Sequence, residues 1–404
     1  MGSNLARVRV TGPLGPYAAG FATALIRLGY TQHSTAHQLR VFAHLSRWLA
    51  AEGLELDDLT PPVCDAFLSA RRADGYTLWL SRKALHPLLK YLREVGAAPP
   101  EPVIALNPTE AMLVRFAAYL ASERGLARST VNEYVYMVRP FLRTRADHQG
   151  ALNLEDLAAA DVTAFVVTNA PGRSIGSAKL MVTALRSLLD FLHVQGLLAN
   201  SFASVVPTVA GSRLAGLPKG LAVGQVQQLL TSCDRRTAVG RRDFAVLTLL
   251  VRLGLRAGEV VALELGDLDW RAGEIVVRGK GDRQERLPLP VDVGTALVDY
   301  LQAGRPRSDY RQVFLRMRAP HRALSPSGLC QIVLWAAHKA GLPPVGAHRL
   351  RHTAATQMLR SGASLTEIGQ VLRHRSLLST AIYAKVDHQA LRQVARPWPT
   401  GAKP

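Results

Sequence analysis

Residues 348–362, HRLRHTAATQMLRSG, hold two histidines and three arginines within one predicted helix. The pattern is helical, and Gly362 stands where a glycine typically follows a helix end. Three distant segments carry side chains of the same kinds: GLRAGE at 254–259, RGKG at 278–281, and LRH at 372–374 followed by Tyr383. These four segments are the candidates for a common functional site.

Together the four segments supply the groups that could transfer a phosphodiester to a side-chain oxygen without a metal. The pentacovalent transition state carries extra negative charge on its non-bridging oxygens, and two arginine forks can each donate two hydrogen bonds to it. Tyrosine, with a pKa of about 10, needs nearby positive charge and a base before it attacks. The leaving 5′ oxygen needs a proton, which a lysine on a hairpin tip can donate.

At these residues the sequence closely resembles the tyrosine recombinase (lambda integrase-like) family, including the Xer recombinases. The resemblance covers residues 215–390 firmly and extends more loosely over 107–205, which is similar to the family's helical core-binding domain. The intervals fit the family: 24 residues from Arg256 to Lys280, 3 from His348 to Arg351, 23 from Arg351 to His374, and 9 from His374 to Tyr383.

The resemblance implies a role for each of the main residues. Tyr383 would attack the scissile phosphate and leave a 3′-phosphotyrosyl link and a free 5′-hydroxyl. Arg256 and Arg351 would clamp the non-bridging oxygens, and Lys280 would be the general acid for the leaving group. Reverse attack by a 5′-hydroxyl of a partner duplex would rejoin the strands by way of a Holliday junction. Such a reaction needs neither ATP nor a metal or other cofactor.

The residues around this set have supporting roles. The resemblance gives His374 a further hydrogen bond to the phosphate, and His348 a part in managing the tyrosine proton. Glu259 lies at i+3 from the first arginine, a helical pairing distance. We interpret His352 as a supporting or structural histidine. Arg373 stands where the family commonly has glycine, so we expect either a looser turn or an added contact with DNA.

The charge of the chain favours a polyanionic partner. Its 404 residues include 49 Lys and Arg against 30 Asp and Glu, a formal net charge of +19. Residues 215–404 hold 28 basic and 14 acidic side chains, so this half is the stronger candidate for phosphate contact. The most apolar run, 244–255, falls short of the ~20 residues that span a membrane. Three scattered cysteines without metal-ligand spacing fit a reducing cytosol. We expect a cytoplasmic, nucleoid-associated bacterial protein.

Stretches rich in proline and glycine divide the chain. We predict an N-terminal tail at 1–14, an additional helical module at 15–98, a linker at 99–106, a helical core-binding (SAM-like) module at 107–205, a linker at 206–220, and a catalytic domain at 221–404. Residues 387–395 would form an exchange helix. The predicted fold is mainly α with a small antiparallel β-sheet, since EIVVRGKGDRQERLPL at 274–289 has the pattern of a hairpin.

The two helical modules are similar to each other. STAHQLRVFAHLSRWL from 34 parallels STVNEYVYMVRPFLRT from 129, GLELDDLTPPVCDAFL from 53 parallels ALNLEDLAAADVTAFV from 151, and ALHPLLKYLREVG from 84 parallels ALRSLLDFLHVQG from 184. Either the modules are related, or two helical bundles align loosely. Each Ser-Thr start can cap a helix. The first module favours a mobile-element integrase or transposase, and would bind a second DNA segment, extend the clamp or contact another protomer.

The predicted partner is double-stranded DNA with specific recombination sites. The resemblance implies a homo-tetramer on DNA, a monomer or weak oligomer when free, and accessory DNA-bending or sister recombinase proteins. The candidate DNA contacts are Arg128, Arg173, Lys179, Arg186, Arg283, Arg286 and Arg373. Two other classes stay open: a catalytically silent DNA-binding or architectural protein of the same fold, and a type IB topoisomerase-like swivelase.

Overall fold

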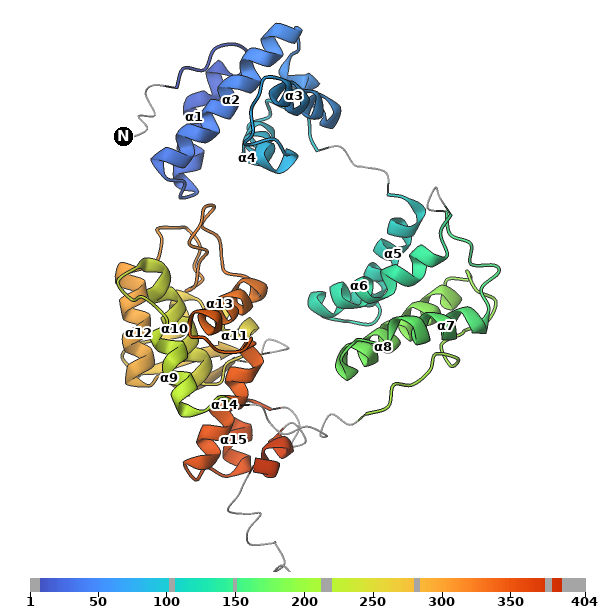
Figure 1. The fold of residues 1–404 in the computed structure, drawn as a ribbon, viewed down its shortest axis with the longest axis vertical. Coiled ribbons are helices and arrows are strands. Elements are labelled where there is room, and N and C mark those ends of the chain that lie inside the picture. The colour runs from blue at the N-terminus through green and yellow to red at the C-terminus, as the bar shows by residue number, and fades with distance from the viewer. Residues whose placement is uncertain are drawn as a thin grey trace, which may run out of the picture. The chain divides into compact units, whose positions relative to one another are not determined.

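The computed structural model describes residues 8–101, 106–147, 151–211, 220–279, 284–374 and 380–386. Val103–Gly216 forms one compact unit, and Met1–Pro102 with Leu217–Pro404 forms the other. Three sets of elements follow one another along the chain (Figure 1). The first two sets each surround one hydrophobic cluster, and the third surrounds two. The structure therefore buries its apolar side chains in separate cores.

The first set of elements packs around Phe21, Phe42 and Phe67, all of which are buried. It consists of η2 (Gly15–Tyr17), α1 (Ala18–Arg27), α2 (Gln32–Glu52), η3 (Leu56–Asp58), α3 (Pro61–Ala73) and α4 (Arg82–Glu94). The side chain of Thr31 caps α2 by accepting a hydrogen bond from the Ser34 N–H. The expected Ser-Thr cap is wrong here, because these two residues lie inside the helix.

The unit Val103–Gly216 contains the second set of helices, built around Phe116, Phe141 and Phe191. The helices are α5 (Pro108–Ser122), α6 (Arg128–Thr144), α7 (Ala159–Asn169) and α8 (Ile175–Val194). The three pairs of similar segments occupy the second, third and fourth helices of the two sets. Ala127 precedes α6 without a side-chain cap, so the second Ser-Thr start is not a cap either.

The third set combines helices with a small sheet, as the hairpin pattern predicted. It begins with α9 (Val223–Thr231), α10 (Ala238–Arg252), α11 (Ala257–Ala262) and η4 (Leu265–Asp267). The antiparallel strands β1 (Leu268–Asp269), β2 (Glu274–Arg278) and β3 (Gln284–Pro288) follow in the sheet order β1-β2-β3. Val276 pairs with Arg286 in the hairpin. Residues 280–283, at its predicted tip, lie outside the described residues.

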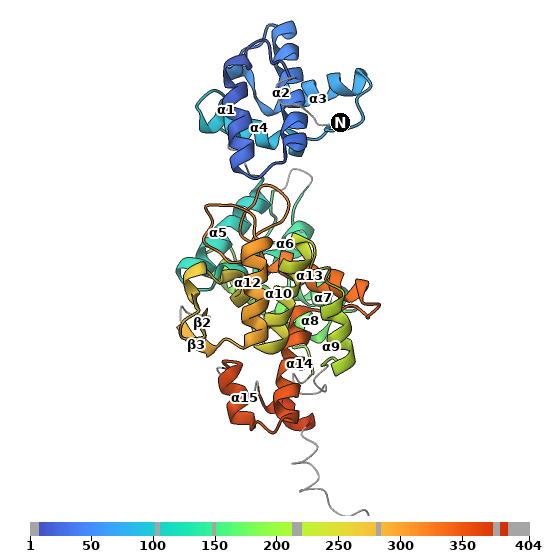
Figure 2. The same cartoon turned by 90° about the vertical axis from the view of Figure 1, so that its left-hand side faces the viewer.

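The last helices are α12 (Val291–Ala303), α13 (Pro326–Lys339), α14 (Ala347–Arg360) and α15 (Leu365–Val371), followed by η5 (Ile382–Val386). Both views show α15 next to α14 (Figures 1 and 2). Gly362 has a φ of 91° just past α14, as expected, and Gly341 has a φ of 67° just past α13. The predicted exchange helix at 387–395 lies outside the described residues. In the part of the chain that the structure describes, no helix could span a membrane.

Candidate active site

Gly254 leads the chain from the buried helix α10 to Arg256. Its φ is 60°, and a Cβ at this position would lie 2.5 Å from Leu372 Cδ2, so the turn requires glycine. Arg256 is the N-cap of α11, and its N–H donates to Glu259 Oε2 at 2.8 Å. Arg256 Nη1 donates to Glu259 Oε1 at 2.6 Å. The expected i+3 pair is present, and it leaves the Arg256 side chain 46% exposed.

Arg351 comes from the middle of α14 and is 2% exposed. Its Nη1 donates to Gly254 O at 2.6 Å, and its Nη2 donates to Leu372 O. Burial, with the nearby Arg256, lowers the pKa of Arg351 to about 10, so the guanidinium stays charged at neutral pH. Two backbone carbonyls from distant segments thus hold this side chain in one orientation.

The turn after α15 keeps the geometry of a glycine although it carries Arg373. Its φ is 55°, in the left-handed region that glycine favours. The carbonyl of Leu372 accepts from Arg351, and that of Arg373 accepts from Arg256 Nη2 at 3.4 Å. The turn is therefore tight rather than loose, and it aims successive carbonyls at both arginines.

The side chain of Arg373 is buried and donates to Glu259 Oε2 at 2.6 Å. This placement argues against the DNA contact expected at Arg373, because its guanidinium is turned inward onto a carboxylate. Burial acts to raise the pKa of Glu259, but Arg373 and Arg256 outweigh it, and the pKa lies below its usual value. One buried, ionised carboxylate thus joins two guanidinium groups.

Tyr383 lies in η5 and is 1% exposed. Its Oη is 2.9 Å from His352 Nδ1. Burial raises the pKa of Tyr383, although Arg351 partly opposes the shift. Burial, with His348 and Arg351, lowers the pKa of His352 to about 4. At neutral pH a neutral imidazole therefore lies beside a protonated phenol, which is the arrangement of a general base and its substrate.

The other two histidines complete the cluster. The ring of His348 meets that of His352 edge-on, with centroids 4.5 Å apart. The ring of His374 is parallel to that of Tyr383 at 6.4 Å, and its Nδ1 lies 2.7 Å from Thr380 Oγ1. Burial, with the nearby arginines, lowers the pKa of both His348 and His374, in the latter to about 4. All three rings are neutral at pH 7.

Two features of this cluster were not expected from the sequence. The histidine in contact with Tyr383 is His352, whereas the sequence favoured His348 for the tyrosine proton. Their i, i+4 spacing places both on one face of α14 and could have indicated either. Thr380, which orients His374, gave no sequence signal. Lys280 lies outside the described residues.

The described candidate DNA contacts belong to both units of the chain. Arg128 is the exposed first residue of α6. The other described candidates bond within their own unit: Arg173 to Asn169 O at 2.8 Å, Lys179 to Gly211 O at 2.6 Å, Arg186 to Val206 O at 2.7 Å, and Arg286 to Glu274 at 3.1 Å. Arg283 lies outside the described residues. Among those described, no group of three or more His, Cys, Asp or Glu could hold a metal.

Comparison with known proteins gives consistent matches. Residues 219–390 match the phage integrase family, and residues 113–196 match the phage integrase N-terminal SAM-like domain. The chain is 43% identical to y4rA of Sinorhizobium fredii, which is named as an integrase/recombinase; the match covers 97% of this chain and 96% of that one.

Two further matches cover less of this chain. It is 31% identical to the tyrosine recombinase XerD of Listeria monocytogenes, over 69% of this chain and 95% of that one. The crystal structure of the XerH site-specific recombinase bound to its palindromic difH substrate shares the fold. That match has a TM-score of 0.55 and 20% identity, and it covers 72% of this chain and 97% of that one.

Proposed function

The chain belongs to the phage integrase family of tyrosine recombinases, and from this premise we propose that Tyr383 is the residue that becomes covalently joined to DNA. The chain is a site-specific recombinase that breaks and rejoins DNA strands. One observation carries the residue assignment. Tyr383, His352, Arg351 and Arg256 come from three distant segments, yet contacts or carbonyl bonds bring them together.

In the cleavage step one phosphorus–oxygen bond forms, one breaks and two protons move. The Tyr383 Oη attacks the scissile phosphorus, the bond from phosphorus to O5′ breaks, and a 3′-phosphotyrosyl ester and a 5′-hydroxyl result. The phenol proton passes to His352 Nδ1, which lies 2.9 Å away. The family resemblance assigns the proton for O5′ to Lys280. Attack by a 5′-hydroxyl from a second duplex reverses the step and rejoins the strands.

The two arginines serve the transition state in different ways. Arg256 is partly exposed and presents its guanidinium to a non-bridging oxygen, while Glu259 fixes its direction. Arg351 is held by two carbonyls, so its remaining N–H groups keep one orientation. His374 adds a donor beside Tyr383. We assign Glu259 and Arg373 the role of positioning Arg256, because they act through contacts with it.

The burial of Tyr383 means that a conformational change has to precede its attack on DNA. At 1% exposure, Tyr383 cannot meet a DNA phosphate in the conformation of the free chain. A shift of η5 has to accompany DNA binding before attack begins. The family members that the chain resembles act on duplex sites, so the release of Tyr383 would be coupled to assembly on such a site.

The assembly follows from the chemistry. Two duplexes exchange four strands, and each tyrosine cleaves one, so a complete reaction requires four protomers on DNA joined through a Holliday junction. We propose three parts within each protomer: a first module at 15–98, a core-binding module at 107–205, and a catalytic domain at 221–404. The two later parts would close on duplex DNA, with phosphate contacts supplying most of the affinity.

Covalent trapping tests the assignment. Wild type and Tyr383→Phe are expressed in a host carrying the native locus, the lysate is denatured, and DNA that stays attached is sequenced at its junction. We expect only the wild type to retain DNA, through a 3′-phosphotyrosine at a reproducible position. Phenylalanine keeps the buried ring, so the variant is a matched control. If neither protein retains DNA while footprinting still shows specific binding, Tyr383 has no catalytic role.

A further inference from the structure

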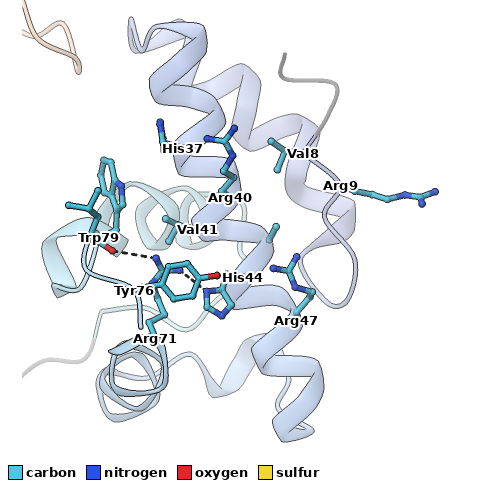
Figure 3. Close-up of a pocket in the computed structure, with 12 residues that line it drawn as sticks. Val8, Arg9, His37, Arg40, Val41, His44, Arg47, Arg71, Tyr76 and Trp79 are labelled. Atoms are coloured by element: carbon cyan, nitrogen blue, oxygen red, sulfur yellow. Dashed lines mark hydrogen bonds between the residues drawn. The ribbon is translucent and has the colours of Figure 1, made fainter. Parts of the chain in front are cut away.

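A cavity of about 500 Å³ opens on the first set of helices, between α2 and the end of α3 with the loop that follows it (Figure 3). Four basic side chains on α2 line it, His37, Arg40, His44 and Arg47, at intervals of three, four and three residues. This spacing places them along one face of the helix. Arg40 and Arg47 are exposed, whereas Arg9 points away from the cavity.

Arg71 of α3 also lines this cavity and is 4% exposed. Its Nη1 lies 2.6 Å from His44 Nδ1, and its Nη2 donates to Leu78 O at 3.4 Å. Among the described residues its Nε has no hydrogen-bond partner. Asp74 Oδ2 lies 3.6 Å from His44 Nε2, on the far side of that ring, and its charge also acts on Arg71. A buried guanidinium without a carboxylate on its own nitrogens is costly unless another anion reaches it.

Two aromatic rings stand beside these side chains. Tyr76 covers the guanidinium of Arg71, whose Cζ lies 4.2 Å from the ring centroid. Trp79 is exposed, and its ring lies near that of His37, with centroids 6.5 Å apart. The φ of Trp79 is 63°, which is rare for a bulky residue. The bond from Arg71 to Leu78 O ties down the loop that presents this indole.

We propose that this cavity binds one unpaired nucleotide of single-stranded DNA, with the phosphate on Arg40, Arg47 and Arg71 and the base against Trp79. Phosphate accepts hydrogen bonds from guanidinium forks and would give the Arg71 Nε, which has no partner among the described residues, an acceptor. A base inside a duplex has both faces covered, so only an unpaired base can lie on an indole within a cavity. The cavity also has the size of a small-molecule site, which is about 300–1,000 Å³.

None of the residues that line this cavity belongs to the set proposed to cleave DNA, so the proposal does not depend on Tyr383. Strand exchange unpairs DNA before the strands are rejoined, and a site that holds an unpaired nucleotide suits that stage. On this proposal the first module binds an unpaired nucleotide, a ligand distinct from the scissile phosphate.

Crosslinking locates the bound strand on the full-length protein. A mixed-sequence single-stranded 12-mer containing bromodeoxyuridine is irradiated with the protein, and tryptic peptides are identified by mass spectrometry. We expect a crosslink in residues 73–82, ADGYTLWLSR, which trypsin releases as one peptide. Trp79→Ala should weaken binding at this site about tenfold, since stacking of one base contributes about 1–3 kcal/mol. Trp79→Phe should restore much of the crosslink.

A matched pair of variants separates phosphate recognition from general charge. Arg40→Gln with Arg47→Gln should lower the crosslink yield and reduce the salt dependence of binding by about 1 in log–log slope. Arg27→Gln with Lys83→Gln removes the same charge from exposed positions on α1 and α4, outside the cavity lining, and should change neither. All four sites are exposed, and thermal melting confirms that the variants fold.

Three results would overturn the proposal. Crosslinks that fall only outside residues 8–98 would place the strand elsewhere. An equal loss with the Arg27 and Lys83 variant would leave only nonspecific attraction. Equal crosslinking of residues 73–82 by the matching duplex would exclude recognition of an unpaired base.

Discussion

Arg351 in the active site and Arg71 in the first module are both almost fully buried, yet their surroundings differ. Arg351 donates to the carbonyls of Gly254 and Leu372. Arg71 has a weak bond to Leu78 O at 3.4 Å and a contact with His44, while its Nε lacks a partner among the described residues. Two carbonyls fix Arg351 before DNA arrives, whereas Arg71 keeps one donor unsatisfied among the described residues.

The contrast separates two ways of using a buried cation. A catalytic donor is most effective when its orientation is set in advance, because no reorganisation is then needed as charge develops. An arginine that binds a ligand contributes more to the affinity if some of its donors have no hydrogen-bond partner until the ligand is bound. The buried Glu259 fits the first case, since it joins Arg256 and Arg373 in the active site.

Arg351→Ala should have the largest effect on strand cleavage. A small effect would contradict the contrast drawn between Arg351 and Arg71. We expect strand cleavage to slow at least about 10³-fold, because two or more preorganised donors are lost. Stability should fall as well, since two carbonyls lose their partner. Covalent complex formation on the trapped site measures the rate. Arg351→Lys keeps the charge but not the fork, and full activity in that variant would contradict the role of the fork.

The two histidines of α14 should differ in their effect on rate. His352→Ala should slow covalent complex formation about 10²-fold by removing the general base, and His348→Ala should slow it less. The 2.9 Å contact with Tyr383 belongs to His352 alone of these two in the described structure. Rates measured across pH would show a base with a low pKa in the wild type. If His348→Ala slowed the reaction more than His352→Ala, His348 rather than His352 would be the residue that accepts the tyrosine proton.

Position 373 tests how the active-site turn is held. Arg373→Gly and Arg373→Ala both remove the ion pair with Glu259, but alanine keeps a side chain at φ 55°. We expect Arg373→Ala to be the less stable variant by about 1 kcal/mol, because left-handed backbone costs about that much outside glycine. Urea unfolding of both proteins gives the difference. Equal stabilities would mean that the turn relaxes once the ion pair is gone.

The smallest expected effect is on the pH dependence of stability. The pKa values of His352 and His374 are lowered to about 4 in the folded chain, against about 6.5 when unfolded. The unfolded chain then binds more protons between these values, so the melting temperature should fall as the pH drops from about 6.5 towards 4. His352→Gln with His374→Gln should flatten that slope. An unchanged slope would assign the acid sensitivity to other groups.

Much of the fold could be predicted from local patterns. The hairpin pattern at 274–289 predicted β2 and β3, and the helical pattern at 348–362 predicted α14. The caps were less predictable, because Ser34 and Thr35 fit the preferences of a cap, yet Thr31 performs that role. The capping residue is the one that precedes the first helical turn, and side-chain packing decides which residue that is. The residue type alone does not determine this position.

The sequence by itself predicted which groups would lie together, because four segments at family spacing carry two arginines, the histidines and a tyrosine. It also predicted the glycine that follows α14, and Gly362 has the left-handed backbone typical of that position. Only the tertiary structure decided that His352 contacts Tyr383, that Arg373 turns inward, and that Arg71 lines a cavity. Each of these depends on the packing of side chains from segments distant in the sequence, and no local pattern specifies which of two neighbouring side chains makes the contact.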